Sequence, residues 1–240
     1  MHLPDKVTGP LRDELGLLQG SAWFGSMPAE LQAIVLRASS LRSASAGETL
    51  ARRGQVPRQW FGVVRGVLKA STSHVDGRVS SHLLAVRSQW IDSEQLIQDA
   101  PRQHDVVALS DSLLIAIDGA IFRRVVLTDI EVCGFVLREV SALHRRTQER
   151  LAHCVALRTD QLIARTVSEL ALELGRCGRI GVELSQEDIS EFVGLSRQTV
   201  NQVLRDLATM GLLKTRYGRV EVTDATALRR YADIRSIDSR

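Results

Sequence analysis

The chain has 240 residues, of which 44% are hydrophobic and 25% are charged, and its formal net charge is +3. This composition is typical of a soluble globular protein, and the length allows two domains or one large one. The sequence has no apolar run near the about 18 residues that a membrane span needs, and it begins without the basic start and apolar stretch of a secretory signal. We therefore expect a cytoplasmic protein with no membrane partner.

The cysteines and the polar motifs give no sign of catalysis or of a metal site. Cys133, Cys154 and Cys177 are widely spaced and match neither a disulfide framework nor a zinc pattern. No segment resembles a nucleophile with its base, a phosphate-binding Walker loop or a pair of catalytic carboxylates. The sequence therefore predicts a protein that is not an enzyme and that holds no metal ion or other cofactor.

The first half of the chain changes from helical to strand patterning near residue 46. Residues 11–43 carry short helical patterns, with Pro28 at one helix start. Over residues 46–118, glycines separate short runs of alternating apolar and polar residues, and Asp76-Gly77 is a typical hairpin turn. Many short strands with regular turns predict a compact antiparallel roll or barrel.

A long helix is predicted after this strand-rich region. Residues 121–156 contain no proline and a single glycine, Gly134. Apolar and small residues recur there at alternating steps of three and four, which is the seam spacing of a two-helix coiled coil. The seam consists of Cys133, Leu137, Val140, His144, Thr147, Leu151 and Cys154. This pattern predicts a homodimer; the alternative is a helix that packs on its own domain.

The C-terminal third reads as two helices around a tight turn, followed by a hairpin. A helix over residues 160–174 leads into a glycine-rich break, and Ser185 can then cap a helix over residues 186–193. A three-residue turn starting at Gly194 leads to a second helix, about 196–210. Two alternating runs around the Tyr-Gly pair of "LLKTRYGRVEV" predict a hairpin. This order predicts a winged helix-turn-helix, whose second helix enters the major groove of DNA.

The outer face of that second helix carries amides and guanidinium groups, where an ordinary solvated face would favour Lys and Glu. Such groups can form bidentate hydrogen bonds with base edges. The residues predicted to contact DNA from this helix are Ser196, Arg197, Gln198, Asn201, Gln202 and Arg205. The hairpin adds Lys214, Arg216 and Arg219, which we expect to contact phosphates.

The segment "LSQEDISEFVGLSRQTVNQVLRDLATMGLLKTRYGRVEV" resembles the DNA-binding end of the Crp/Fnr family of bacterial transcription regulators. "SAGETLARRGQVPRQWFGVVRGVLKAS" resembles the start of that family's cyclic-nucleotide-binding β-roll, and "PRQHDVVAL" resembles the end of its phosphate cassette. The likeness implies an α+β fold in three parts. These are an N-terminal antiparallel β-roll effector domain over residues 1–120, a long dimerisation helix over 121–157 and a C-terminal winged helix-turn-helix over 158–240.

The resemblance also implies a function. A member of this family is a homodimeric transcription regulator that binds a pseudo-palindromic operator in double-stranded DNA and contacts RNA polymerase when it activates. Two alternatives stay open at this point. One is a DNA-binding regulator that acts without an effector, and the other is a cyclic-nucleotide-binding regulatory subunit that acts on a protein partner.

Departures from the family pattern in the second helix concern DNA specificity. Arg197 stands where the family has its guanine-binding arginine. Gln198 stands where many members have a glutamate that accepts from cytosine, and Gln202 stands where many have a second arginine. The resemblance therefore implies an operator that differs from the family's best-known half-site.

Departures in the β-roll concern the effector. The candidate pocket residues are Asp92, Ser93, Arg102, Gln103, Thr147 and Gln148. In a gapless alignment, Asp92 and Ser93 stand where members that bind cyclic AMP have Gly-Glu, while the phosphate-binding arginine is kept as Arg102. A carboxylate beside the phosphate repels it, and serine is too short to bind the ribose hydroxyl. We therefore expect cyclic AMP to bind poorly or not at all, with a different effector or none in its place.

Overall fold

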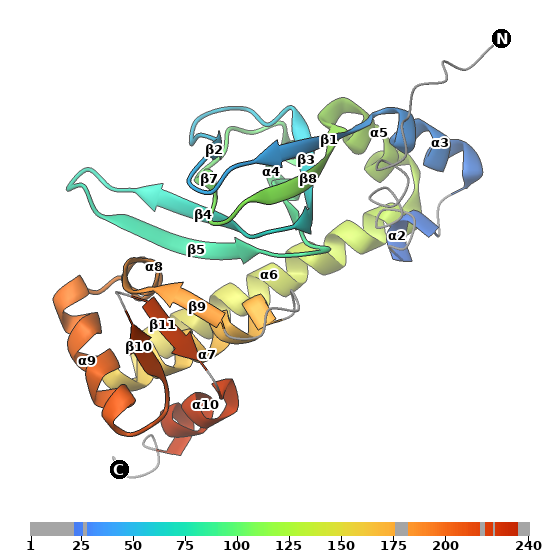
Figure 1. Ribbon diagram of the computed structural model, residues 1–240. Coiled ribbons are helices and arrows are strands. Elements are labelled where there is room, and N and C mark those ends of the chain that lie inside the picture. The colour runs from blue at the N-terminus through green and yellow to red at the C-terminus, as the bar shows by residue number, and fades with distance from the viewer. Residues whose placement is uncertain (1–21, 26–27, 176–181, 217–218, 223, 235–240) are drawn as a thin grey trace. The chain divides into compact units, whose positions relative to one another are not determined.

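The computed structural model describes residues 22–25, 28–175, 182–216, 219–222 and 224–234 (Figure 1). The predicted glycine-rich break after residue 175 and the predicted hairpin turn at residues 217–218 lie outside these ranges. The chain forms two compact units, one within residues 1–68 and 85–143 and the other within 69–84 and 144–240. Within the described ranges, none of the helices combines the length and the apolar character of a membrane span.

The N-terminal half contains two antiparallel sheets, as the sequence predicts. One sheet has the strand order β1 (Ser39–Ala44), β8 (Ser112–Asp118), β3 (Gln59–Arg65) and β6 (Trp90–Ile91). The other has the order β2 (Thr49–Ala51), β7 (Asp105–Ala108), β4 (Leu68–Ser73) and β5 (Val79–Ala85). The predicted hairpin turn joins β4 to β5, and Gly77 adopts there a φ of +81° that favours glycine.

The predicted helical stretch at the start of the chain is partly wrong. Helix α2 (Ala22–Gly25) and helix α3 (Ala29–Arg37), which begins directly after Pro28, agree with it. Residues 39–44 instead form strand β1, which pairs along its whole length with β8, from Ser39 opposite Ile117 to Ala44 opposite Ser112. Pairing with a strand that lies far away in the sequence outweighs the weak local preference.

An aromatic cluster fills the core of the first unit. Trp60 is 1% exposed and stacks on Trp90 with ring centroids 3.8 Å apart. Trp60 also contacts Phe122, and the ring centroids of these two residues are 4.1 Å apart. The indole N–H of Trp60 donates to the Oγ of Ser93, 2.8 Å away, at the start of the short helix α4 (Ser93–Gln98). The core therefore holds the beginning of α4 firmly in place.

The predicted long helix consists of two helices, α5 (Gly119–Thr128) and α6 (Ile130–Ala156). Asp129 separates them with an extended backbone, and its carboxylate accepts hydrogen bonds from the backbone N–H groups of Glu131 and Val132, each at 3.0 Å. Asp129 therefore ends one helix and caps the next. The domain limits at residues 120 and 157 stay predictions.

The C-terminal part of the second unit is a helix-turn-helix with a three-stranded sheet. Its elements are α7 (Thr159–Gly175), β9 (Val182–Ser185), α8 (Gln186–Val193), α9 (Arg197–Thr209), β10 (Lys214–Arg216), β11 (Arg219–Val222) and α10 (Ala225–Ile234). The strand order is β10-β11-β9. The helix, turn, helix and hairpin are confirmed, whereas strand β9 and helix α10 were not predicted. Ile163, Ile189 and Leu204 are fully buried in its core.

Candidate nucleic-acid interface and effector pocket

Side-chain caps and a left-handed glycine define the turn between α8 and α9. The Oγ of Ser185 accepts from the backbone N–H of Asp188 at 2.9 Å, and the Oγ of Ser196 accepts from that of Thr199 at 3.1 Å. Gly194 ends α8 with φ +71° and ψ +23°, a conformation that a residue with a Cβ adopts at a cost. These local signals are the ones that the sequence showed, and they fix where α9 begins.

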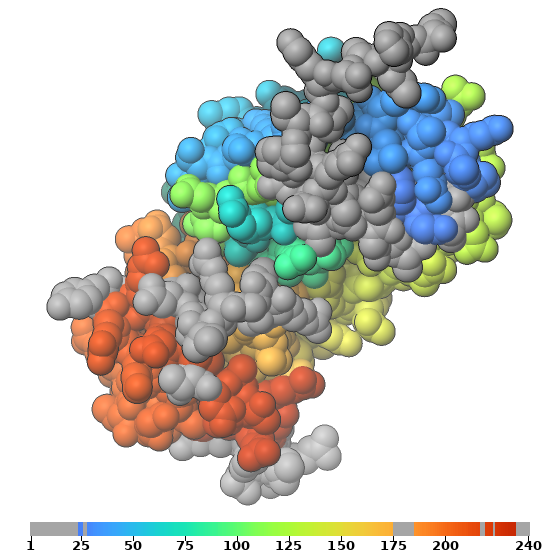
Figure 2. All heavy atoms as spheres, turned by 45° about the vertical axis from the view of Figure 1, so that its right-hand side comes forward, coloured from blue at the N-terminus to red at the C-terminus, as the bar shows by residue number. Residues whose placement is uncertain are grey.

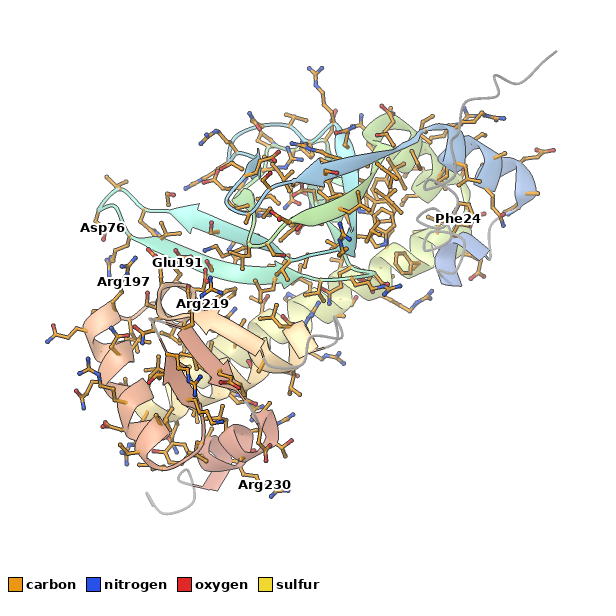
Figure 3. All side chains as sticks on the ribbon, viewed as in Figure 1. Phe24, Asp76, Glu191, Arg197, Arg219 and Arg230 are labelled. Carbon is orange, nitrogen blue, oxygen red and sulfur yellow. The ribbon has the colours of Figure 1, made fainter. Side chains whose placement is uncertain are left out.

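Helix α9 is buried on one side and exposed on the other. Val200, Leu204 and Leu207 are at most 1% exposed. The opposite side carries the predicted DNA-contacting residues, of which Ser196, Arg197, Gln198, Gln202 and Arg205 are exposed and Asn201 is half-buried. Figure 3 shows Arg197 at the start of α9, the end that a winged helix-turn-helix inserts into the groove.

Besides the capping Ser196, Arg197 and Gln202 have partners on the protein. Arg197 forms an ion pair with Glu187 of α8, and the two side chains are 61% and 57% exposed. The amide of Gln202 donates to the Oδ1 of Asp206, one helical turn further along α9, at 3.1 Å. Pairs this exposed contribute little to stability, so both can be exchanged for contacts with DNA at small cost.

The strands after α9 carry the predicted phosphate contacts. Lys214 and Arg216 on β10 and Arg219 on β11 are all exposed, and Arg216 lies directly opposite Arg219 in the pairing. Figure 3 places Arg219 in the C-terminal unit, as it does Arg197. Adjacent cations on one hairpin attract the phosphate backbone whatever the base sequence.

In the first unit, the candidate effector pocket contains a buried ion cluster. The Nε of Arg102 donates to the Oδ2 of Asp92 at 2.7 Å, and the two side chains are 6% and 0% exposed. The Nε2 of His104 lies 3.3 Å from the other carboxylate oxygen of Asp92. Asp92 has a φ of +70°, in the left-handed region where the resemblance places a glycine. The carboxylate therefore faces inward and holds Arg102.

This cluster changes the role expected for Asp92. The sequence predicts a carboxylate that repels a phosphate bound to Arg102. In the structure, Asp92 binds Arg102 itself, so the positive partner of a phosphate is already engaged. His104 was missed, and its place two residues after Arg102 is the signal that could have indicated it.

The other predicted pocket residues lie apart from this cluster or have other contacts. Ser93 is buried and bonded to Trp60, while Gln103 is exposed and its amide donates to the carbonyl of Pro101 at 3.2 Å. Thr147 and Gln148 are exposed on the part of α6 that belongs to the second unit. Their predicted contact with an effector stays a prediction.

Among the residues that the structure describes, no group of three or more His, Cys, Asp or Glu side chains could hold a metal ion. Cys133 is half-buried and Cys154 is exposed, both as free thiols, while Cys177 lies outside the described residues.

A helix-turn-helix with a basic wing, in a chain that also contains a two-sheet roll and a 27-residue helix, defines a DNA-binding regulator with an effector-type domain. Family models agree: a Crp-like helix-turn-helix domain matches residues 149–231, and a cyclic nucleotide-binding domain matches residues 41–129. The chain belongs to the Crp/Fnr family of bacterial transcription regulators. It is a DNA-binding regulator of that type.

Individual relatives are similar over most of their length. The chain is 24% identical over 190 residues to a CRP-like cAMP-activated global transcriptional regulator of Mycobacterium tuberculosis, covering 78% of this chain and 85% of that one. It is 28% identical over 191 residues to the transcriptional regulator LdrP of Thermus thermophilus, covering 77% and 93%. A solved CRP/FNR-family regulator from Thermus thermophilus has the same fold, with a TM-score of 0.68, 19% identity and coverage of 81% and 98%.

The buried Asp92–Arg102 pair predicts that Asp92→Asn lowers the free energy of unfolding much more than the same carboxylate-to-amide change in an exposed ion pair. Asp92→Asn should lower the free energy of unfolding by about 3–5 kcal/mol, because it leaves the buried Arg102 guanidinium without a counter-charge. Asparagine tolerates the left-handed backbone, so strain does not account for the loss. Urea unfolding followed by tryptophan fluorescence measures it.

The control is Glu48→Gln, which weakens the Arg42–Glu48 pair, whose side chains are 34% and 39% exposed. Because this pair is exposed, Glu48→Gln should lower the free energy of unfolding by less than about 1 kcal/mol. Equal losses from the two variants would contradict a buried, paired Asp92.

Proposed function

We propose that this regulator binds a pseudo-palindromic operator as a homodimer, with helix α9 of each subunit in the major groove. The observation that carries the proposal is the exposed face of α9, where amides and guanidinium groups face outward while Val200, Leu204 and Leu207 are buried. Arg197 would bind a guanine through two hydrogen bonds. Gln198 and Gln202 would bind adenine or tolerate several bases, and Ser196, Asn201 and Arg205 would complete the contact surface.

The wing has a different role in this proposal. Lys214, Arg216 and Arg219 would bind phosphates, which strengthens attachment to any DNA and sets the register of α9 without selecting bases. The alternative of a regulatory subunit that acts on a protein partner is less well supported, because the relatives named above are transcription regulators.

Exposed apolar side chains along α6 support the dimer. Ile130, Leu137, Leu151 and Val155 are 82%, 64%, 66% and 82% exposed. Figure 2 shows yellow-green atoms of α6 at the molecular surface. A series of apolar residues this exposed is costly in water and is buried when a second copy packs along it.

The other seam residues fit this arrangement to different degrees. His144, Thr147 and Cys154 are exposed, whereas Cys133 and Val140 are partly buried and pack against the core of their own subunit. The dimer would therefore bury mainly the leucines and the polar residues between them.

We also propose that cyclic AMP is not the effector. The guanidinium of Arg102 is buried and bound to Asp92, so a phosphate would have to displace a carboxylate that is covalently part of the site. The roll would respond to a different effector or serve as a scaffold. When the regulator activates transcription, it would contact RNA polymerase. It would work in the bacterial cytoplasm, and it would not catalyse a reaction.

The proposed base contact predicts the effect of Arg197→Ala. On a duplex enriched from fragmented genomic DNA, this variant should lose about 1–3 kcal/mol of specific affinity and tolerate other bases at one guanine position, because a bidentate contact is removed. Fluorescence anisotropy on the duplex and on single-base variants measures both effects.

Arg219→Ala is the matched control, with the same change on the wing. It should weaken all duplexes alike and reduce the dependence of affinity on salt. A loss confined to one base position in Arg219→Ala would reverse the roles assigned to helix and wing.

The proposed seam predicts that Leu137→Glu combined with Leu151→Glu gives monomers, because each layer would bury unpaired carboxylates. Light scattering after size exclusion measures the mass. The control pair is Val56→Glu with Leu172→Glu, two apolar residues outside α6 that are 45% and 44% exposed, and it should remain dimeric. If the α6 variant still has the mass of a dimer, the subunits contact each other through a different surface.

The paired arginine predicts no micromolar binding of cyclic AMP to the purified dimer. Displacement of the buried Asp92 carboxylate, together with the missing ribose-binding carboxylate, should move a micromolar site to about millimolar or weaker. Isothermal titration calorimetry measures the affinity. Micromolar binding accompanied by tighter operator binding would overturn this part of the proposal.

A further inference from the structure

The hairpin formed by β4 and β5 belongs to a sheet of the effector-type domain and also packs with the DNA-binding helices. Its residues 69–84 lie within the cyclic nucleotide-binding match at residues 41–129. In the structure they form part of the same compact unit as residues 144–240. A segment of the effector-type sequence is therefore packed with the DNA-binding helices.

A partly buried ion cluster joins this hairpin to the first helix of the helix-turn-helix. The Nζ of Lys69 on β4 donates to the Oδ1 of Asp188 at 2.9 Å and to the Oε2 of Glu191 at 2.7 Å. The hydroxyl of Ser81 on β5 donates to the same Glu191 oxygen at 2.6 Å. The Lys69 side chain is only 10% exposed, and that of Glu191 is 14% exposed. Both strands of the hairpin thus bind α8.

The charge state of Lys69 makes this contact strong. Burial by itself lowers the pKa of Lys69, but the hydrogen bonds to Glu191 and Asp188 outweigh it, and the pKa lies above its ordinary value. The ammonium group is therefore charged near neutral pH. Removal of Lys69 would leave two carboxylates of α8 close together and poorly hydrated, which disfavours this position of the hairpin.

Helix α6 reaches the same place through Arg150. Its Nη1 donates to the backbone carbonyl of His82 on β5 at 3.3 Å, and its guanidinium lies 4.7 Å above the ring of Phe192 on α8. Phe192 is next to Glu191, the carboxylate that Lys69 and Ser81 bind. The second half of α6, the hairpin and α8 are therefore held together by neighbouring contacts.

We propose that Lys69 is a positioning residue for operator binding, which fixes α8 and hence α9 relative to α6 by holding the hairpin on α8. This inference rests on the proposed dimer, in which α6 forms the axis between two recognition helices. Half-sites one helical turn apart, about 34 Å, demand that both helices be held at a set distance and angle. A subunit that is already ordered loses less conformational freedom when it binds both half-sites.

Space beside α9 is compatible with this role. A hollow of about 730 Å³ lies between hairpin residues 74 and 76–80 and the turn that begins α9, and Asp76 and Arg197 both line it. Figure 3 shows Asp76 at the tip of the hairpin and Arg197 at the start of α9. The hairpin thus holds α8 through Lys69 and Ser81 while its tip leaves an open hollow at the start of α9.

The test compares two kinds of duplex with the full-length dimer. One kind carries two half-sites at the selected spacing or with two base pairs inserted between them, and the other carries a single half-site. Lys69→Met should bind the correctly spaced duplex about tenfold more weakly, keep its affinity for the single half-site and discriminate less between the two spacings. Lys69→Arg, which can still bind both carboxylates, should behave as the parent protein does.

Arg87→Met is the control for loss of one positive charge, at an exposed position after β5, and should leave the spacing preference unchanged. Ser81→Ala removes one hydrogen bond to Glu191 without burying an unpaired charge, so it serves if Lys69→Met does not fold. It should reduce discrimination between the spacings about threefold.

Equal losses on both kinds of duplex would overturn the inference, since a merely structural residue would give that result. An unchanged spacing preference in Lys69→Met would overturn the inference as well. If Lys69→Met does not fold, an unchanged spacing preference in Ser81→Ala would overturn it. Arg197→Ala, measured on the same duplexes, distinguishes failure of the proposed function from failure of the role proposed for Lys69. If it fails to weaken the single half-site, the proposed function itself is wrong, whereas a normal Arg197 effect with unchanged spacing preference rejects only the role of Lys69.

Discussion

Burial of one side of α9 is the constraint on which the account of function depends. Val200, Leu204 and Leu207 are at most 1% exposed, so rotation of the helix about its axis would expose apolar surface and bury amides and guanidinium groups. The caps at Ser185 and Ser196 and the left-handed Gly194 fix where the helix begins. The helix therefore presents one defined set of side chains, and Arg197 lies at the end that enters a groove.

Two ion clusters, one buried and one partly buried, connect charged side chains within the protein. Asp92 supplies Arg102 with an internal counter-ion where the family resemblance implies a ligand's phosphate. Lys69 connects a hairpin of the effector-type sequence to α8. In both clusters the free-energy cost of burying charge is offset by close pairing, and loss of either partner would leave an uncompensated charge. We infer a regulator in which a side chain of the effector-type domain, and not a ligand, is the counter-ion of Arg102. Its hairpin orients the DNA-binding helices.

The parts of the fold that follow from local signals were predictable from the sequence. Helices α8 and α9 have serine caps and glycine ends, and the hairpin turn at Asp76-Gly77 has a typical pair of residues. Strand β1 was missed because its structure depends on pairing with β8, more than 60 residues later. The division at Asp129 was missed although aspartate is a good cap. Lys69 and Asp188 are 119 residues apart, and no sequence pattern links them.

The most direct measurement is selection of duplexes from random-sequence DNA by the full-length protein, followed by sequencing of the bound fraction. An inverted repeat should be enriched, with a guanine in each half-site and half-site centres about one helical turn, 10–10.5 base pairs, apart. Enrichment of a single asymmetric site would contradict the dimeric arrangement. Absence of any enriched sequence, in a protein that still binds DNA, would contradict base recognition by α9.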